Sequence, residues 1–189
     1  MKNNNEIFLG EFIASCFLVM VIVGSGIMAE NLTNDNAVRL LANTIATGAG
    51  LYVLITDFAN ISGAHLNPFV SLSMYLTKRI KGKELLTFIP AQILGCLLGV
   101  MLANVFFEHS IIELSTKNRD GFHIFLSEIV ATFGLIFIIF ATLKDGKTTV
   151  AACVATYISA GYWFTSSTSF ANPAVAIPRT FTDSFTGIN

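Results

Sequence analysis

Charge is scarce in this chain of 189 residues, because only 12% of the residues are Asp, Glu, Lys or Arg, whereas 53% are hydrophobic. Soluble domains carry about 25% charged residues, so the composition indicates a membrane protein. The net charge of −1 gives no electrostatic reason to expect a nucleic-acid partner. The lipid bilayer is the first partner that the composition predicts.

Cysteine is also scarce, and Cys16, Cys96 and Cys153 lie far apart in apolar runs. Their spacing does not match a metal site, and we interpret them as small buried hydrophobic residues. The sequence shows no metal-ligand cluster, no paired aspartates on facing helices and no nucleophile–base arrangement. We therefore expect no metal, no cofactor and no enzymatic activity.

Long apolar stretches dominate the chain, and a helix needs about 20 mostly apolar residues to span a bilayer. The first stretch is longer than the core of a signal peptide and contains Glu11, so we interpret it as a retained spanning helix. The predicted fold is an all-α membrane bundle with five spanning helices. These cover residues 7–29, 40–58, 85–107, 122–143 and 149–167.

Two further apolar stretches are too short to span the bilayer. One runs from Asn67 to about residue 76, and the other from Asn172 to about residue 185. Each begins with Asn-Pro, and Asn is a preferred N-cap while Pro suits the first position of a helix. The first follows the second span and the other follows the fifth span. The two half-helices therefore enter from opposite faces and meet near the midplane, as in an inverted repeat.

A pair of glutamates supports the repeat, since Glu11 and Glu128 stand in similar contexts in the first span of each half. We place the first repeat at residues 1–116 and the second at residues 117–189. A carboxylate within the membrane is costly unless it finds partners. Backbone N–H groups of the re-entrant loops are the expected partners, and a proton relay is the alternative.

Basic residues predict the orientation. With the N-terminus inside, seven flank the inner ends of the spans and three flank the outer ends, as the positive-inside rule requires. We expect a multi-pass protein of the plasma membrane with a cytoplasmic N-terminus. The inner set is Lys2, Lys78, Arg79, Lys81, Lys83, Lys144 and Lys147, and the outer set is Arg39, Lys117 and Arg119.

These motifs resemble the major intrinsic protein family, the aquaporins and aquaglyceroporins. The resemblance implies six spans, two half-helices, one pore per subunit and a homotetramer. It also implies structural roles for the buried polar residues Glu11, Glu128, Gln92 and His65. The matching residues are Glu11, the segment 62–68 (SGAHLNP), Ala91-Gln92, Glu128 and Asn172-Pro173-Ala174.

The opposed half-helix N-termini make the pore centre positive, because each carries roughly +0.5 charge and unpaired N–H groups. The pore centre is predicted at Asn67, Pro68, Asn172, Pro173 and Ala174. The asparagine amides orient a passing oxygen and interrupt a proton wire. The expected function is therefore passive passage of water and small uncharged solutes, with ions and protons excluded.

The resemblance places an outer constriction at Thr47, Ala160, Ser169 and Val175. Water-selective members usually have an aromatic residue, His and Arg at the first, second and fourth positions. Small or aliphatic residues here predict a wider, uncharged ring that passes glycerol or undissociated metalloid acids such as arsenite.

Three nearby polar or aromatic residues leave alternatives open. Arg179 lies one turn beyond Val175, so it either reaches back to the constriction or pairs with Asp183 at i+4. Tyr162 and Trp163 either line the pore or anchor at the interface, which is the default for such residues. His65 makes a static hydrogen bond or gates the cytoplasmic approach by protonation.

Three features depart from the family pattern. Phe69 replaces a small residue after the first Asn-Pro, and Pro178 interrupts the second half-helix. A sixth span is expected near residue 190, beyond Asn189. A truncated product, a fragmentary sequence or completion by another chain would each explain this. A non-conducting channel remnant is an alternative because of the missing helix. A secondary transporter with broken helices is another alternative, because it also uses half-helix termini at the midplane.

Overall fold

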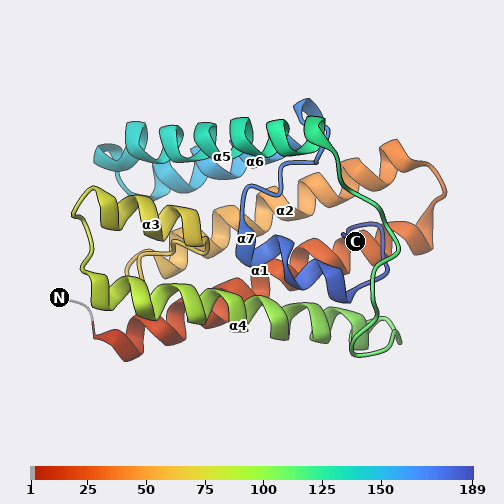
Figure 1. Cartoon of the computed structure of the whole chain (residues 1–189), viewed down its shortest axis with the longest axis horizontal. Helices are drawn as coiled ribbons and strands as arrows, with labels where there is room; N and C mark the ends of the chain where they lie inside the picture. Colours follow the sequence, from red (N-terminus) through yellow and green to blue (C-terminus); the bar gives the residue numbers. More distant parts are fainter. Residues whose placement is uncertain (1–2) are drawn as a thin grey trace.

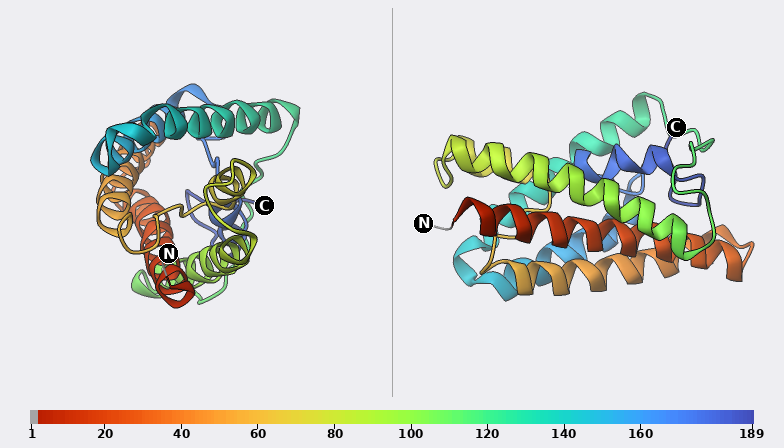
Figure 2. Two further views of the ribbon diagram at one scale, coloured as in Figure 1. Left: turned by 90° about the vertical axis from the view of Figure 1, so that its left-hand side faces the viewer. Right: turned by 90° about the horizontal axis from the view of Figure 1, so that it is seen from below.

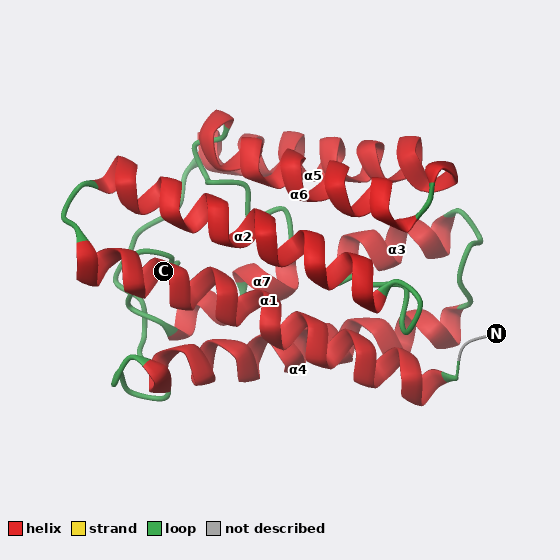
Figure 3. Cartoon of the chain, turned by 180° about the vertical axis from the view of Figure 1, so that it is seen from behind, coloured by secondary structure: helices red, strands yellow, loops and turns green. Residues whose placement is uncertain are grey.

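The computed structural model describes residues 3–189, and every regular element among them is helical (Figure 3). Lys2, which belongs to the predicted inner set of basic residues, lies outside the described residues. The all-α fold is confirmed. The long helices are α1 (Asn4–Leu32), α2 (Asn36–Phe58), α4 (Gly82–Phe106), α5 (Phe122–Thr142) and α6 (Lys147–Phe164). The short ones are α3 (Pro68–Leu76), α7 (Pro173–Ala176) and the 3-10 turns η1 (Leu143–Asp145) and η2 (Pro178–Phe181).

All five predicted spans are present as helices. Four of them, α1, α2, α4 and the segment Phe122–Asp145, are long and apolar enough to cross a membrane. Helix α6 has 18 residues and begins at Lys147, which makes it shorter than the others. It packs against α2 and α5 within the same bundle.

Local signals set where the first two helices begin. The Asn3 side chain accepts a hydrogen bond from the backbone N–H of Asn5, and Glu6 completes a capping box. The Asp35 side chain accepts from two backbone N–H groups at the start of α2. The α1–α2 connection is therefore a short capped turn, and α2 begins four residues earlier than its hydrophobicity predicts.

The long helices follow one another around an arc in the order α4, α1, α2, α6 and α5. The short helices α3 and α7 lie on the side between α4 and α5, and they contact each other (Figures 1 and 2). The N-terminus and the α3–α4 and α5–α6 connections lie at one end of the bundle, and the C-terminus lies toward the other (Figure 1). The two half-helices thus occupy the open side of the arc.

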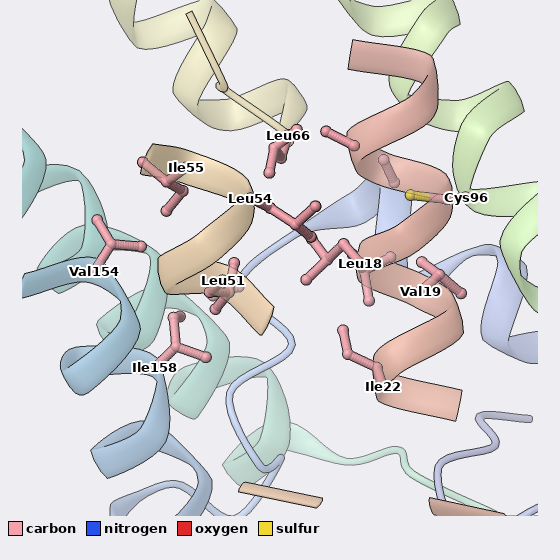
Figure 4. Close-up of a cluster of buried hydrophobic side chains, with 14 of the residues drawn as sticks. Leu18, Val19, Ile22, Leu51, Leu54, Ile55, Leu66, Cys96, Val154 and Ile158 are labelled. Carbon is pink, nitrogen blue, oxygen red and sulfur yellow. The ribbon is translucent and has the colours of Figure 1, made fainter. Parts of the chain in front are cut away.

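Helices α1 and α4 pack most closely, because two glycines of α4 let the backbones approach. A Cβ atom at Gly95 would collide with the carbonyl oxygen of Phe12, and one at Gly99 with that of Cys16. Side chains from all five long helices and from α3 and α7 form the apolar interior, and Figure 4 shows the part contributed mainly by α1, α2 and α6. Leu18, Leu51, Ile55, Val154 and Ile158 from this cluster also line the central cavity.

The predicted extent of the second half-helix is wrong. Helix α7 ends at Ala176 and the chain continues as η2, instead of running as one helix to about residue 185. Pro178 explains the break, because it has no N–H to donate to the carbonyl of Ala174. The outer half-helix is therefore a single turn, whereas α3 has nine residues.

Candidate functional site

The loops before the two Asn-Pro motifs adopt the same unusual backbone. Ala64 and Leu66, three residues and one residue before Asn67, have φ values of 49° and 51°. Ser169 and Ala171 hold the same places before Asn172, with φ values of 54° and 45°. Non-glycine residues in this region cost roughly 1–3 kcal/mol each, so surrounding contacts must hold the loops in place.

Glu11 supplies those contacts in the first repeat. Its carboxylate accepts hydrogen bonds from the backbone N–H groups of His65 and Leu66 at 3.0 and 2.7 Å. It also accepts from the Ser62 hydroxyl at 2.6 Å and from the Gln92 amide at 2.8 Å. Four donors compensate the burial of this side chain, which is fully enclosed.

Glu128 has the same role in the second repeat, with fewer partners. Its two oxygens accept from the backbone N–H groups of Phe170 and Ala171 at 2.9 and 2.6 Å. Within residues 3–189, no side chain donates a hydrogen bond to this carboxylate, and Glu128 is only partly buried. Both carboxylates bind backbone N–H groups as the structural interpretation predicts.

Asn67 and Asn172 tie the two loops together by reciprocal hydrogen bonds. The Asn67 amide donates to the carbonyl of Ala171 at 2.7 Å, and the Asn172 amide donates to the carbonyl of Leu66 at 2.7 Å. Each side-chain oxygen caps its own helix by accepting from a backbone N–H two residues later. Pro68 and Pro173 occupy the first helical positions, and Ala174 is buried.

A cavity of about 390 Å³ passes this junction and is lined by both asparagines. Arg79 and Lys147 line it as well, and so does Arg179 beyond the asparagines. Because an amide nitrogen carries two hydrogens, each asparagine keeps one for a molecule in the cavity. Aliphatic side chains from α1, α2, α5 and α6 form most of the remaining wall.

The predicted constriction is only partly assembled. Thr47, Ser169 and Val175 line the cavity, whereas Ala160 is exposed and is absent from the lining. The lining row on α6 runs through Val154, Ile158 and Tyr162. Ala160 lies two residues from both Ile158 and Tyr162, about 200° around the helix from each, so it faces away from the cavity.

Tyr162 occupies the place predicted for Ala160. It is buried and lines the cavity, and its hydroxyl is 3.0 Å from the Thr47 hydroxyl. The default interpretation of Tyr162 as an interfacial anchor is therefore wrong, while Trp163 is exposed. The four-residue spacing of Tyr162 from Ile158 on an apolar helix is the sequence signal that favours Tyr162 on the lining face.

Arg179 reaches back to the cavity, and it does not pair with Asp183. Its Nε donates to the carbonyl of Thr186 at 2.5 Å, and its guanidinium lies 4.9 Å from the centre of the Phe170 ring. Asp183 instead accepts hydrogen bonds from Thr116. The Nη atoms of Arg179 have no hydrogen-bond partner within residues 3–189, which leaves them available to a molecule in the cavity.

His65 and Gln92 both join the network around the first loop. Gln92 is fully buried and donates to Glu11 and to the Ser71 hydroxyl. The His65 ring lies 3.0 Å from the same hydroxyl, stacks on Phe88 and lines the cavity. These contacts support the static interpretation of His65.

Phe69 points away from the cavity and lines a second hollow, a groove of about 440 Å³ on α5. The groove exposes Ile129 and Phe133, which lie one and five residues after Glu128. Phe12 and Cys16 hold the same places after Glu11 in α1. Those two residues of α1 are covered by the glycines of α4. The corresponding face of α5 has no covering helix among the described residues.

These features define a helical membrane protein with two opposed half-helices around a central cavity. The family described as "Major intrinsic protein" matches residues 2–185, and the chain belongs to that family.

Individual relatives agree with this membership. The chain is 47% identical to "Aquaglyceroporin AqpS" of Rhizobium meliloti (strain 1021) over 180 residues, covering 95% of this chain and 77% of the relative. It is 36% identical to "Aquaporin TIP1-2" of Musa acuminata, covering 74% of this chain and 57% of the relative. For "Aquaporin-4" of Rattus norvegicus the identity is 30%, with 77% and 46% covered. The chain thus spans about half the length of the latter two.

A solved structure shows the same fold. The X-ray structure of the aquaglyceroporin from Plasmodium falciparum superposes with a TM-score of 0.70, covering 97% of this chain and 80% of that one. The sequence identity is 20%, so the match concerns the fold alone.

Proposed function

We propose that the chain forms a channel for the passive passage of water and small uncharged solutes. The observation that carries this proposal is the reciprocal pair of bonds from Asn67 and Asn172 inside a cavity with aliphatic walls. The asparagine amides offer hydrogen-bond donors at this level of the cavity. A neutral molecule can exchange water for these groups, whereas an ion loses hydration that they cannot replace.

Glycerol and undissociated metalloid acids such as arsenite are the solutes we favour. Thr47, Tyr162, Ser169 and Val175 place hydroxyl groups on one part of the constriction and an aliphatic side chain on another. Molecules with several hydroxyl groups and no charge match this mixture. The relative from Rhizobium meliloti is named an aquaglyceroporin, which agrees with this choice.

We propose a plasma-membrane location with the N-terminus in the cytoplasm. The end of the bundle that holds the N-terminus also holds the α3–α4 and α5–α6 connections (Figure 1). Arg79 belongs to the first of these connections and Lys147 begins α6 directly after the second, which supports this orientation by the positive-inside rule. We further propose a homotetramer, which rests on membership of the family. The division into repeats at residues 1–116 and 117–189 stays a prediction, and the matched loops of the two halves support it.

We also propose that a further spanning helix covers the groove on α5. On the equivalent face of α1, Gly95 and Gly99 of α4 pack against the backbone, and the Gln92 amide donates a hydrogen bond to Glu11. By the same relationship, the covering helix would present small residues to Ile129 and Phe133. It would also direct a donor to Glu128.

Stopped-flow light scattering of proteoliposomes tests the channel. We expect shrinkage followed by rapid reswelling in glycerol, with rates linear in the solute gradient. The double variant Asn67→Asp/Asn172→Asp keeps the side-chain shapes but removes both amide donors, so we expect it to lose glycerol flux. Saturable uptake driven by an ion gradient would instead identify a transporter, and no flux above empty vesicles would identify a non-conducting remnant.

A further inference from the structure

A second arginine lies beside Arg179. Arg119 belongs to the connection between α4 and α5, far from the half-helices in sequence. Its guanidinium is 5.8 Å from the centre of the Phe170 ring, the ring that Arg179 also approaches at 4.9 Å. Phe170 lies in the loop before Asn172 and lines the cavity. Two cationic side chains therefore share one aromatic residue of the pore wall.

Hydrogen bonds hold Arg119 in this place. One Nη donates to the carbonyl of Phe185 at 2.8 Å, and the other lies 3.4 Å from the Thr168 hydroxyl. Both partners are neutral. Within residues 3–189, neither Arg119 nor Arg179 forms an ion pair, whereas the neighbouring Lys117 lies 3.7 Å from a Glu30 oxygen. Neither guanidinium group therefore has a carboxylate at ion-pair distance among these residues.

The outer half-helix is too short to supply much positive potential by its dipole. A helix dipole comes from aligned peptide units, and α7 has a single turn against the nine residues of α3. Val175, one position on the constriction, is aliphatic. The positive potential at this mouth must therefore come mainly from side chains.

We propose that Arg119 is a specificity-determining residue of the channel, which together with Arg179 excludes cations and protons at the mouth near Phe170. The inference rests on the proposed channel function. The charge of Arg119 acts through space, so its removal changes ion exclusion and leaves uncharged solutes unaffected.

Proton and potassium leak in proteoliposomes, measured with an internal pH dye and a potassium electrode, tests the role. We expect Arg119→Gln, which keeps hydrogen-bond donors but loses the charge, to raise the leak about tenfold with glycerol flux unchanged. Arg119→Lys keeps the charge and should restore exclusion. Lys117→Gln removes a paired charge from the same connection and is the matched control, with no change expected.

A second variant tests the same proposal if Arg119→Gln does not fold. Thr168→Glu places a carboxylate beside the Arg119 guanidinium and should raise the leak as well. Wild-type leak in both Arg119→Gln and Thr168→Glu would overturn the proposal. So would equal leak in Arg119→Lys and Arg119→Gln, which would show that Arg119 only anchors the Phe185 segment. If the unmodified protein gave no glycerol flux above that of empty vesicles, the channel function itself would be refuted.

Discussion

Thr47 of α2 and Tyr162 of α6 join their hydroxyl groups at 3.0 Å beside the central cavity. The contact links two helices whose residues are far apart in sequence, and both side chains are buried. It ties α2 to α6 beside the constriction. Tyr162 is the largest side chain among the constriction residues, so it limits the size of the passing solute.

Replacing this tyrosine should change selectivity. We expect Tyr162→Ala to raise glycerol permeability several-fold relative to water permeability, because it removes the ring from the constriction. Tyr162→Phe keeps the ring and loses only the hydroxyl, so the ratio should stay near that of the wild type. Stopped-flow measurements of both solutes in the same vesicles provide the ratio. An unchanged ratio in Tyr162→Ala would show that the constriction lies elsewhere.

The two glutamates should differ in their contribution to stability. Glu11→Gln replaces one acceptor oxygen by a donor that faces N–H and O–H groups, and we expect a loss of about 3 kcal/mol. Glu128→Gln should cost less, because Glu128 is partly exposed and holds two donors instead of four. Unfolding titrations in detergent measure both. Equal losses would contradict the asymmetry between the two loops.

Acid should loosen the contact between the α4–α5 connection and the C-terminal segment. Hydrogen bonds from the backbone N–H and hydroxyl of Thr116 hold the pKa of the Asp183 carboxyl below its usual 3.8. A lowered pKa stabilises the fold above pH 3.8, and this stabilisation disappears as the pH falls through the folded-state value. The thermal midpoint of wild type should therefore exceed that of Asp183→Asn at neutral pH and converge with it in acid. A difference that persists at low pH would contradict this assignment.

A sixth helix packed on α5 should cover its groove and stabilise the protein. If the coding sequence beyond residue 189 encodes an apolar helix, extending the chain should raise both yield and glycerol flux. Ile129→Trp should then destabilise the extended protein by filling the groove, and it should leave the 189-residue chain unaffected. Equal effects in both proteins would mean that no helix packs there.

The sequence was sufficient for the features that depend on local chemistry. The Asn-Pro caps, the glutamates and the break at Pro178 each follow from the hydrogen bonds that those residue types can make. Their pairing across the midplane followed from the order of the spans.

Side-chain direction around a helix was harder to predict. The resemblance places Ala160 at the constriction, whereas the turn of the helix directs it to the outside of α6 and directs Tyr162, two residues later, to the cavity. The sequence identifies Arg119 only as a basic residue near a membrane face, because nothing local indicates that its connection folds back over Phe170. Such tertiary placement depends on the docked C-terminal segment, which has no periodic pattern.

Cysteine accessibility tests most directly whether the central cavity is the conduction path. In a Cys153→Ser background, Val175→Cys places a thiol in the cavity, and Ala160→Cys places one on the exposed face of α6. We predict that a small mercurial reagent blocks glycerol flux through Val175→Cys vesicles and leaves Ala160→Cys vesicles unaffected. Unaltered flux in Val175→Cys, or block in Ala160→Cys, would contradict a solute path past the paired asparagines.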